Sequence, residues 1–198
     1  MKRGAIALGL CVLLSGCGAP PPLYGDPFLH LVDQRSATVP IDQPVKVEQP
    51  LGLIFSDNVE LYLKYTKQGE DQLRSFGPLT NTVAAADIDP KFIAGRVLAM
   101  LKERYPDIEL LHDFNEAIAK GKQSVCLVDI QVAIGRSSGG TTTVDLSTFF
   151  FDDSMSPKSR LTGHGSGTIP YPAFDTQVQS STEQALAELK GKLDTLAE

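Results

Sequence analysis

Three stretches in the second half of the chain alternate apolar and polar residues, and a period of two predicts β-strands. They are Val125–Ile134, Thr142–Phe151 and Arg160–Ile169. In the first of them the even-numbered positions are all apolar, whereas Asp129 and Gln131 occupy the other face. We therefore expect one face of this strand to meet the core and the other to meet water.

The first two of these strands are separated by a turn rich in serine and glycine, Arg136–Gly140, and are predicted to form a hairpin. A slip of one residue would turn Val144 and Leu146 to solvent, so even positions must pair with even positions. The expected register sets Val132 opposite Val144, Ile130 opposite Leu146 and Cys126 opposite Phe150.

Glycines recur on one face of the third strand, at Gly163, Gly165 and Gly167. A row of residues without side chains leaves room for another backbone or a helix to approach closely. We expect such a contact on this face.

The first half of the chain gives shorter strand signals. Leu51–Phe55 is an apolar run that predicts a buried strand, and Ile108–Leu111 predicts a short one. Val59–Tyr65 alternates and favours a strand, although Leu61, Tyr65 and Gln68 would share one face of a helix, and this alternative stays open. The glycines and proline of Lys67–Asn81 predict a loop.

Apolar residues spaced by three and four predict helices elsewhere. Asp89 and Pro90 form a typical helix start, followed by a stripe at Ile93, Val97, Met100 and Leu101 that ends before Pro106. A short helix is expected over Asp113–Ala119, stopped by Lys120 and Gly121. The final helix, Asp175–Leu196, carries a long leucine- and alanine-rich stripe suited to covering the sheet.

These elements predict a single globular α+β (α/β) domain over residues 46–198. It has a mainly antiparallel sheet of about four or five strands, with helices at 90–105 and 175–196 packed on one face. Residues 17–45 repeat proline among polar residues, and we expect a free-running tether there.

The N-terminus has a different pattern. Lys2 and Arg3 precede an apolar run, Ala5–Leu14, which is too short to span a bilayer and is typical of a secretory signal peptide. It ends on Leu14-Ser15-Gly16-Cys17, which resembles the lipobox of bacterial lipoproteins.

That resemblance implies that residues 1–16 are removed and that Cys17 becomes acylated on its thiol and its new amino group. It also implies a location, because an Asp after the acylated Cys retains such proteins in the inner membrane, whereas this chain has Gly18. We expect lipid anchoring to the outer membrane, facing the periplasm. If the source has a single membrane, only the outward-facing anchor is implied.

The net charge limits the classes of binding partner that we expect. The formal net charge is −6 and becomes more negative once Lys2 and Arg3 leave, which argues against nucleic acid and against electrostatic attraction to anionic headgroups. Membrane contact must then come from the lipid.

Cys126 is the remaining thiol of the mature chain, and its place on an apolar strand face predicts a core residue.

Candidate chemistry is sparse. Gly163-His164-Gly165-Ser166-Gly167 suggests a hydrolase, yet a nucleophile elbow needs serine at the centre of Gly-x-Ser-x-Gly, where this chain has His164. No catalytic residue is therefore assigned. A metal could in principle draw on three histidines and three aspartates, but their spacing is not that of a metal site; they are His30, His112, His164, Asp113, Asp152 and Asp153. We predict no metal and no cofactor.

The leading hypothesis is a non-catalytic envelope lipoprotein that binds another envelope protein or supports its assembly. The first alternative is a lipid-anchored hydrolase using His164 or Ser166. The second is a carrier of a lipid or glycan in a groove between helix and sheet. Convergent His, Ser and Asp side chains would favour the hydrolase, and a deep apolar pocket would favour the carrier.

Overall fold

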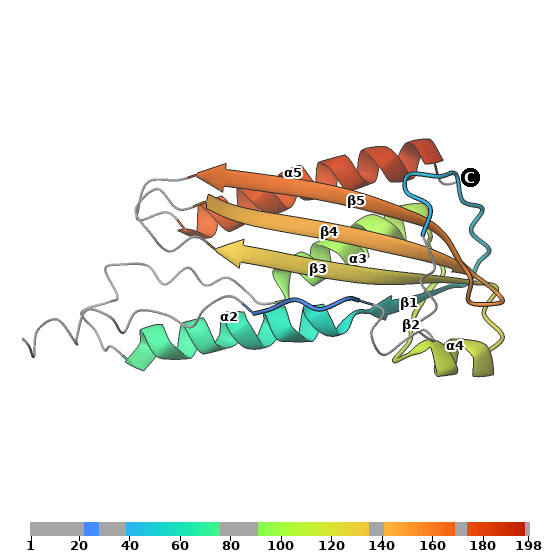
Figure 1. Cartoon of the computed structure of the whole chain (residues 1–198), viewed down its shortest axis with the longest axis horizontal. Helices are drawn as coiled ribbons and strands as arrows, with labels where there is room; N and C mark the ends of the chain where they lie inside the picture. The colour runs from blue at the N-terminus through green and yellow to red at the C-terminus, as the bar shows by residue number, and fades with distance from the viewer. Residues whose placement is uncertain (1–21, 28–38, 76–90, 135–140, 169–173, 197–198) are drawn as a thin grey trace, which may run out of the picture.

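A computed structural model describes residues 22–27, 39–75, 91–134, 141–168 and 174–196. These form a five-stranded sheet in the order β2-β1-β3-β4-β5, with helices packed on it (Figure 1). The strands are β1 (Leu51–Phe55), β2 (Ile108–Leu110), β3 (Ser124–Ile134), β4 (Thr141–Asp152) and β5 (Pro157–Thr168). The helices are α2 (Asp57–Ser75), α3 (Phe92–Arg104), α4 (Phe114–Ala119) and α5 (Phe174–Leu196). The predicted α+β class is confirmed.

The sheet is mixed. β3, β4 and β5 are antiparallel neighbours, whereas β1 runs parallel to both β2 and β3. The predicted hairpin register is confirmed: Val132 pairs with Val144, Ile130 with Leu146 and Cys126 with Phe150. Burial of both apolar faces fixed the parity of this pairing, and the seven residues between Ile134 and Thr142 selected the register.

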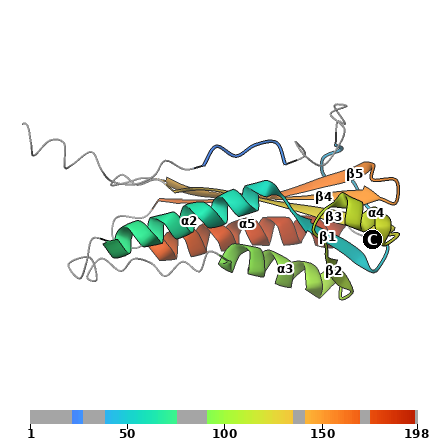
Figure 2. The same ribbon diagram turned by 90° about the horizontal axis from the view of Figure 1, so that it is seen from below.

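The main core lies between one face of the sheet and three helices, α2, α3 and α5 (Figure 2). The predicted stripe of α3 is buried there through Ile93, Val97, Met100 and Leu101. Asp89 and Pro90, the predicted start of this helix, lie outside the described residues, and Lys91 occupies the N-cap position. The face expected to hold two helices therefore holds a third, α2.

The strand predicted at Val59–Tyr65 is wrong, because this segment forms the first part of α2. Val59, Tyr62 and Tyr65 are buried on one side of the helix, at a spacing of three, while Leu61 is 37% exposed. The helix continues to Ser75, so the loop predicted from Lys67 is also wrong as far as that residue; residues 76–81 lie outside the described residues.

The glycine row of β5 contacts a helix, as predicted. A Cβ atom built on Gly163 would lie 2.0 Å from the carbonyl oxygen of Ala185. One built on Gly165 would lie 1.8 Å from the carbonyl oxygen of Ser181. No side chain fits at these distances, so the two glycines allow the α5 backbone to rest directly on the strand.

The other face of the sheet carries a second apolar cluster at the end covered by α4, made of Ile54, Leu111, Phe114, Ala117, Val125, Leu127, Phe149 and Phe151. The Asp113 carboxylate caps α4 by accepting from the Glu116 amide, and Gly121, with φ of 63°, follows the helix. The expectation that this face of β3 meets water is therefore wrong for Val125 and Leu127, because α4 covers them.

Parts of the predicted tether pack on the domain. Val45 is 6% exposed and belongs to the main core, and Ile41 bridges to Arg160 of β5. Tyr24 lies against the same core from the segment 22–27, which Figure 1 shows between β3 and α2. A free-running tether is thus wrong for residues 22–27 and 39–45; residues 17–21 and 28–38 lie outside the described residues.

None of the helices in the described ranges combines the length and the apolar content that crossing a membrane requires.

Candidate functional site

A polar hollow of about 320 Å³ opens on the sheet face opposite α3 and α5, across β3, β4 and β5. We call the part of the sheet around it the open face. The hollow is lined by Asp129, Gln131, Asp145, Leu146, Ser147, Arg160, Thr162, Gly163 and His164. The period-two alternation of the strands produces this composition, because each apolar residue turned to the helices leaves a polar neighbour turned away from them.

A histidine and an aspartate meet at the rim of the hollow. Asp145 and His164 are opposite each other on β4 and β5, and His164 Nδ1 lies 2.6 Å from Asp145 Oδ1. Their side chains are 54% and 56% exposed. Ser166 lies on the same face of β5, opposite Thr143, but does not line the hollow. No hydrogen bond between the Ser166 hydroxyl and His164 is found among the described residues.

Arg160 supplies a cation on the opposite side of the hollow. Its Nη2 donates to Ser147 Oγ at 3.2 Å, and its guanidinium carbon lies 5.2 Å from the centre of the Phe149 ring. The main chain of Arg160 is held as well, because its N–H donates to the Pro40 carbonyl and its carbonyl accepts from the Asp42 N–H. Ser147 and the Phe149 ring thus hold the guanidinium, and Pro40 and Asp42 hold the main chain of Arg160.

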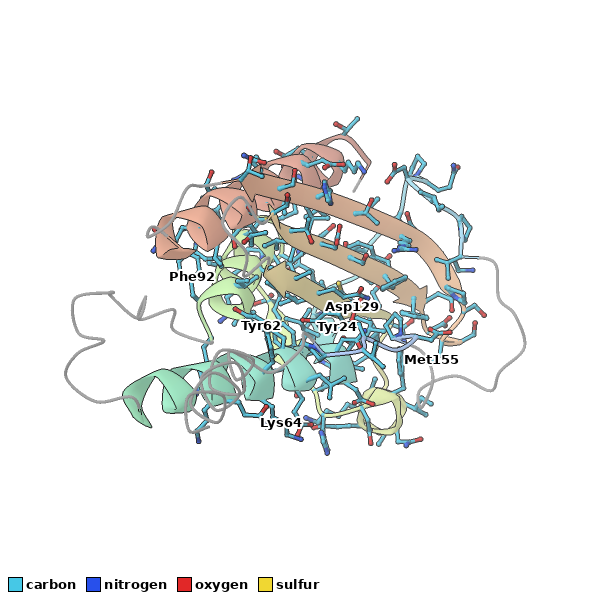
Figure 3. The ribbon with its side chains drawn as sticks, turned by 60° about the vertical axis from the view of Figure 1, so that its left-hand side comes forward. Tyr24, Tyr62, Lys64, Phe92, Asp129 and Met155 are labelled. Carbon is cyan, nitrogen blue, oxygen red and sulfur yellow. The ribbon has the colours of Figure 1, made fainter. Side chains whose placement is uncertain are left out.

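Asp129 lines the hollow and is only 3% exposed. Its Oδ1 accepts from Ser56 Oγ at 2.5 Å and from Asn58 Nδ2 at 2.8 Å, and its Oδ2 accepts from Gln131 Nε2 at 2.8 Å. Three donors satisfy this buried carboxylate. Asp129 therefore joins β3 to the first turn of α2, and Figure 3 shows it beside Tyr24.

The free edge of β5 is closed by side chains of α5. The His164 N–H donates to Glu188 Oε2 at 2.9 Å, and the Ser166 N–H donates to Gln184 Oε1 at 3.2 Å. The His164 N–H and Lys192 hold the pKa of Glu188 below its usual range, so the carboxylate stays charged. An edge strand whose N–H groups already have partners is a poor template for strand addition.

The other sequence candidates have structural roles. Asp113 caps α4, and Asp152 Oδ1 accepts from the amides of Ser154 and Ser156 in the turn after β4. His30 lies outside the described residues, and His112 donates its main-chain N–H to Glu116. Within the part of the chain that the structure describes, no group of three His, Cys, Asp or Glu residues could hold a metal ion.

Cys126 is fully buried in β3, and burial raises the pKa of its thiol. It therefore holds almost no thiolate and is a core residue. Cys17, the predicted lipid attachment site, lies outside the described residues.

Sequence reasoning singled out His164 and Ser166 but missed Asp145, Arg160 and Asp129. The alternation already placed Asp145 on the polar face of its strand. The pairing of Asp145 with His164 could not be predicted, because the register between β4 and β5 depends on a turn whose sequence did not constrain it.

The chain matches no known protein-family model, and no match exists among the curated proteins compared with it. Two solved structures of PelC from Paraburkholderia phytofirmans are similar in shape. A dodecamer of a PelC variant is 10% identical, with a TM-score of 0.41 over 78% of this chain and 94% of that chain. A second PelC dodecamer is 11% identical, with a TM-score of 0.37 over 80% and 94%. At these scores the likeness transfers neither function nor partner.

Proposed function

We propose that this protein is a non-catalytic envelope lipoprotein, anchored through Cys17, that binds another envelope protein or supports its assembly through the open face. The lipobox-like Leu14-Ser15-Gly16-Cys17 carries the anchoring part of the proposal. The polar hollow carries the binding part, because it gathers donors, acceptors and both signs of charge on a sheet face that the three large helices leave uncovered. The expected location is the outer membrane, facing the periplasm.

The anchor is tested by Cys17→Ala. The variant should fold and be recovered as a soluble periplasmic or precursor form, because an acidic domain supplies no second membrane signal. Mass spectrometry of the wild-type protein should find the N-terminal cysteine acylated. A Cys17→Ala protein that still sedimented with membranes after a high-salt wash would contradict a single lipid anchor.

The hydrolase alternative rests on the His164–Asp145 contact of 2.6 Å beside the hollow. An imidazole oriented by a carboxylate is one part of a catalytic triad, but the serine must lie within reach of the other ring nitrogen. Ser147, which also lines the hollow, accepts instead from Arg160. Among the described residues the pair has no nucleophile in hydrogen-bond contact, which supports binding over catalysis.

The carrier alternative needs an apolar groove between a helix and the sheet. The hollow lies on the face away from α3 and α5 and is lined mainly by polar side chains, so it does not provide that groove. The close contact of α5 with Gly163 and Gly165 leaves no room for a ligand between that helix and β5 at those positions.

Complementation of a deletion strain separates binding from catalysis. His164→Ala/Ser166→Ala removes the candidate catalytic groups; in a binding subunit it only trims contacts of the open face and should lower function in part, whereas an enzyme should lose function by orders of magnitude. Thr162→Glu instead puts bulk and charge into the hollow and spares His164, with Lys192, 3.2 Å from Thr162 Oγ1, able to pair with the new carboxylate. It should abolish function in a binding protein.

The reverse pattern would contradict the proposal. Loss of function in the double alanine variant, with a normal melting curve and with Thr162→Glu still active, would identify an enzyme, because catalytic groups act as a unit.

A further inference from the structure

The segment 22–27 is held in a built site near one end of the sheet. Tyr24 Oη donates to the Val132 carbonyl at 2.8 Å and accepts from the Val132 N–H at 3.0 Å. The Tyr24 ring packs on the main core, and burial raises the pKa of its hydroxyl. It therefore remains a neutral donor, and it satisfies both main-chain groups of a β3 residue that lies beyond the β1 pairing.

Asn58 holds the next residue of this segment. Its Oδ1 accepts from the Gly25 N–H at 2.9 Å, and its Nδ2 donates to the Gly25 carbonyl at 3.0 Å. Asn58 is 3% exposed, and the same Nδ2 also donates to buried Asp129. If Gly25 left, a buried amide would lose two hydrogen bonds, so the segment is held in place rather than resting loosely on the surface.

These contacts set the direction in which the chain leaves the domain. Gly25 lies at the level of Asn58 and Asp129, and Tyr24 reaches Val132, two residues from the end of β3. From Gly25 back to Tyr24 the contacts of this segment therefore shift towards the end where β3 finishes. We call this the exit end; β4 begins and β5 finishes there, since Thr141 pairs with Thr168.

The covalent chain between the anchor and this segment is short. The docked residue Tyr24 is seven residues after Cys17, and seven steps of up to about 3.6 Å reach no further than about 25 Å. At about 3.4 Å per residue, Val132 lies about 7 Å from the exit end of β3 and about 27 Å from its start. The exit end is therefore well within reach of an acylated Cys17, whereas the opposite end would contact a bilayer only if the chain between Cys17 and the docked Tyr24 were almost fully extended.

We infer that the docked segment 22–27 makes the exit end the membrane-proximal surface, with the sheet standing away from the lipid and the turn after β4 pointing away from it. This inference rests on the proposed lipid anchor. The surface that faces the exit end is a lipid bilayer. The short covalent link to acylated Cys17 holds it there, and charge does not, because the chain is acidic. The net charge of −6 likewise gives no attraction to anionic headgroups that would hold the molecule flat on the bilayer.

The test uses the acylated full-length mature protein in vesicles of phosphatidylethanolamine and phosphatidylglycerol that carry a nitroxide on some headgroups. A fluorophore is attached at Thr168→Cys, at the exit end, or at Asp153→Cys, in the turn after β4; both positions are exposed. Buried Cys126 does not react, and acylated Cys17 has no free thiol. We expect severalfold stronger quenching at position 168 than at position 153.

Two variants test the docked segment itself. Tyr24→Phe removes both hydroxyl hydrogen bonds and should reduce the difference between the two labels. A long Gly-Ser spacer inserted between Ala19 and Pro20 leaves the domain intact and should abolish it, whereas the same spacer appended after Glu198 should not.

Equal quenching at the two positions in the wild-type protein, or a difference that survives the inserted spacer, would overturn the inference while leaving the anchor in place. A protein that is not acylated, or that does not bind the vesicles at all, would instead contradict the proposed anchor.

Discussion

The two faces of the β3–β5 sheet are formed by alternate residues of the same three strands, yet they differ in nearly every physical property. On the helix-covered face Ile130, Leu146 and Leu161 are at most 1% exposed. On the open face Asp145 and His164 keep more than half of their side chains in solvent. One face supplies the burial that stabilises the fold, and the other holds polar groups with little cost to it.

The contact distances differ in the same way. Against α5 the strand backbone is so close that glycine alone fits, whereas the hollow on the open face leaves about 320 Å³ unfilled. Substitutions on the helix-covered face should therefore change stability, and substitutions on the open face should change recognition.

The largest effect is expected from Gly165→Ala. Its Cβ would lie 1.8 Å from the Ser181 carbonyl oxygen, so α5 must move away from the sheet. We expect failure to fold or a loss of about 4 kcal/mol or more in the free energy of unfolding, measured by denaturant titration. Gly191→Ala, in the same helix with nothing within 4 Å of the added Cβ, is the matched control. It should stabilise by about 0.5–1 kcal/mol. Equal effects of the two substitutions on stability would contradict the claim that the close contact between α5 and β5 requires glycine.

Asp129→Ala should have the next largest effect, because Asp129 is the one open-face carboxylate that the fold buries among the residues lining the hollow. The change leaves Ser56 and Gln131 without this acceptor and Asn58 Nδ2 with the Gly25 carbonyl alone, and we expect a loss of about 2–3 kcal/mol. Asp129→Asn keeps the shape and one acceptor oxygen and should cost less. A melting temperature unchanged by Asp129→Ala would show that the network contributes nothing to stability.

A smaller, pH-dependent effect is expected at the edge of the sheet. Lys120 first, and then Lys122, lower the pKa of Glu109 in β2 from 4.5 to about 2 by hydrogen bonding. A lowered pKa in the folded state means that this contribution to stability is fully present above the unfolded pKa and is lost as the pH falls towards 2. The difference in melting temperature between wild type and Glu109→Gln should therefore shrink from pH 7 to pH 2. A difference independent of pH would contradict this assignment.

The smallest effect on stability is expected from His164→Ala/Ser166→Ala. The His164–Asp145 pair is solvent-exposed, and truncation removes no core volume, so the change should stay below about 0.5 kcal/mol. A calorimetric melting curve checks this directly. A loss comparable to that of Asp129→Ala would mean that the open face also stabilises the fold.

The elements with a strict alternation were predictable, because burial of one face decides the strand and, together with the length of the turn, its register. That reasoning succeeded for β3 and β4. It failed for Val59–Tyr65, where the apolar residues fit both the alternation of a strand and the spacing of a helix. The acidic residues Asp57 and Glu60, which the first turn of a helix favours, were the available signal for α2.

Other features depend on contacts between segments far apart in the sequence and could not be predicted locally. Proline spacing predicted a tether over 17–45, yet Tyr24 and Gly25 dock because Val132 and Asn58 offer them matching donors and acceptors. Asp129 was expected in water, but the first turn of α2 covers it. The glycine row, by contrast, predicted the close helix contact correctly, because a missing side chain leaves room whatever its partner is.

The most direct test of the binding account is site-specific photo-crosslinking in intact cells. A crosslinking amino acid at Ser166 lies on the open face, and one at Lys102 lies on the exposed side of α3; both positions are solvent-exposed. We predict a discrete adduct with another envelope protein from position 166, absent from position 102 and lost when Thr162→Glu is combined with it. An adduct from position 102 alone, or an adduct at 166 that Thr162→Glu does not affect, would contradict the claim that the open face is the binding surface.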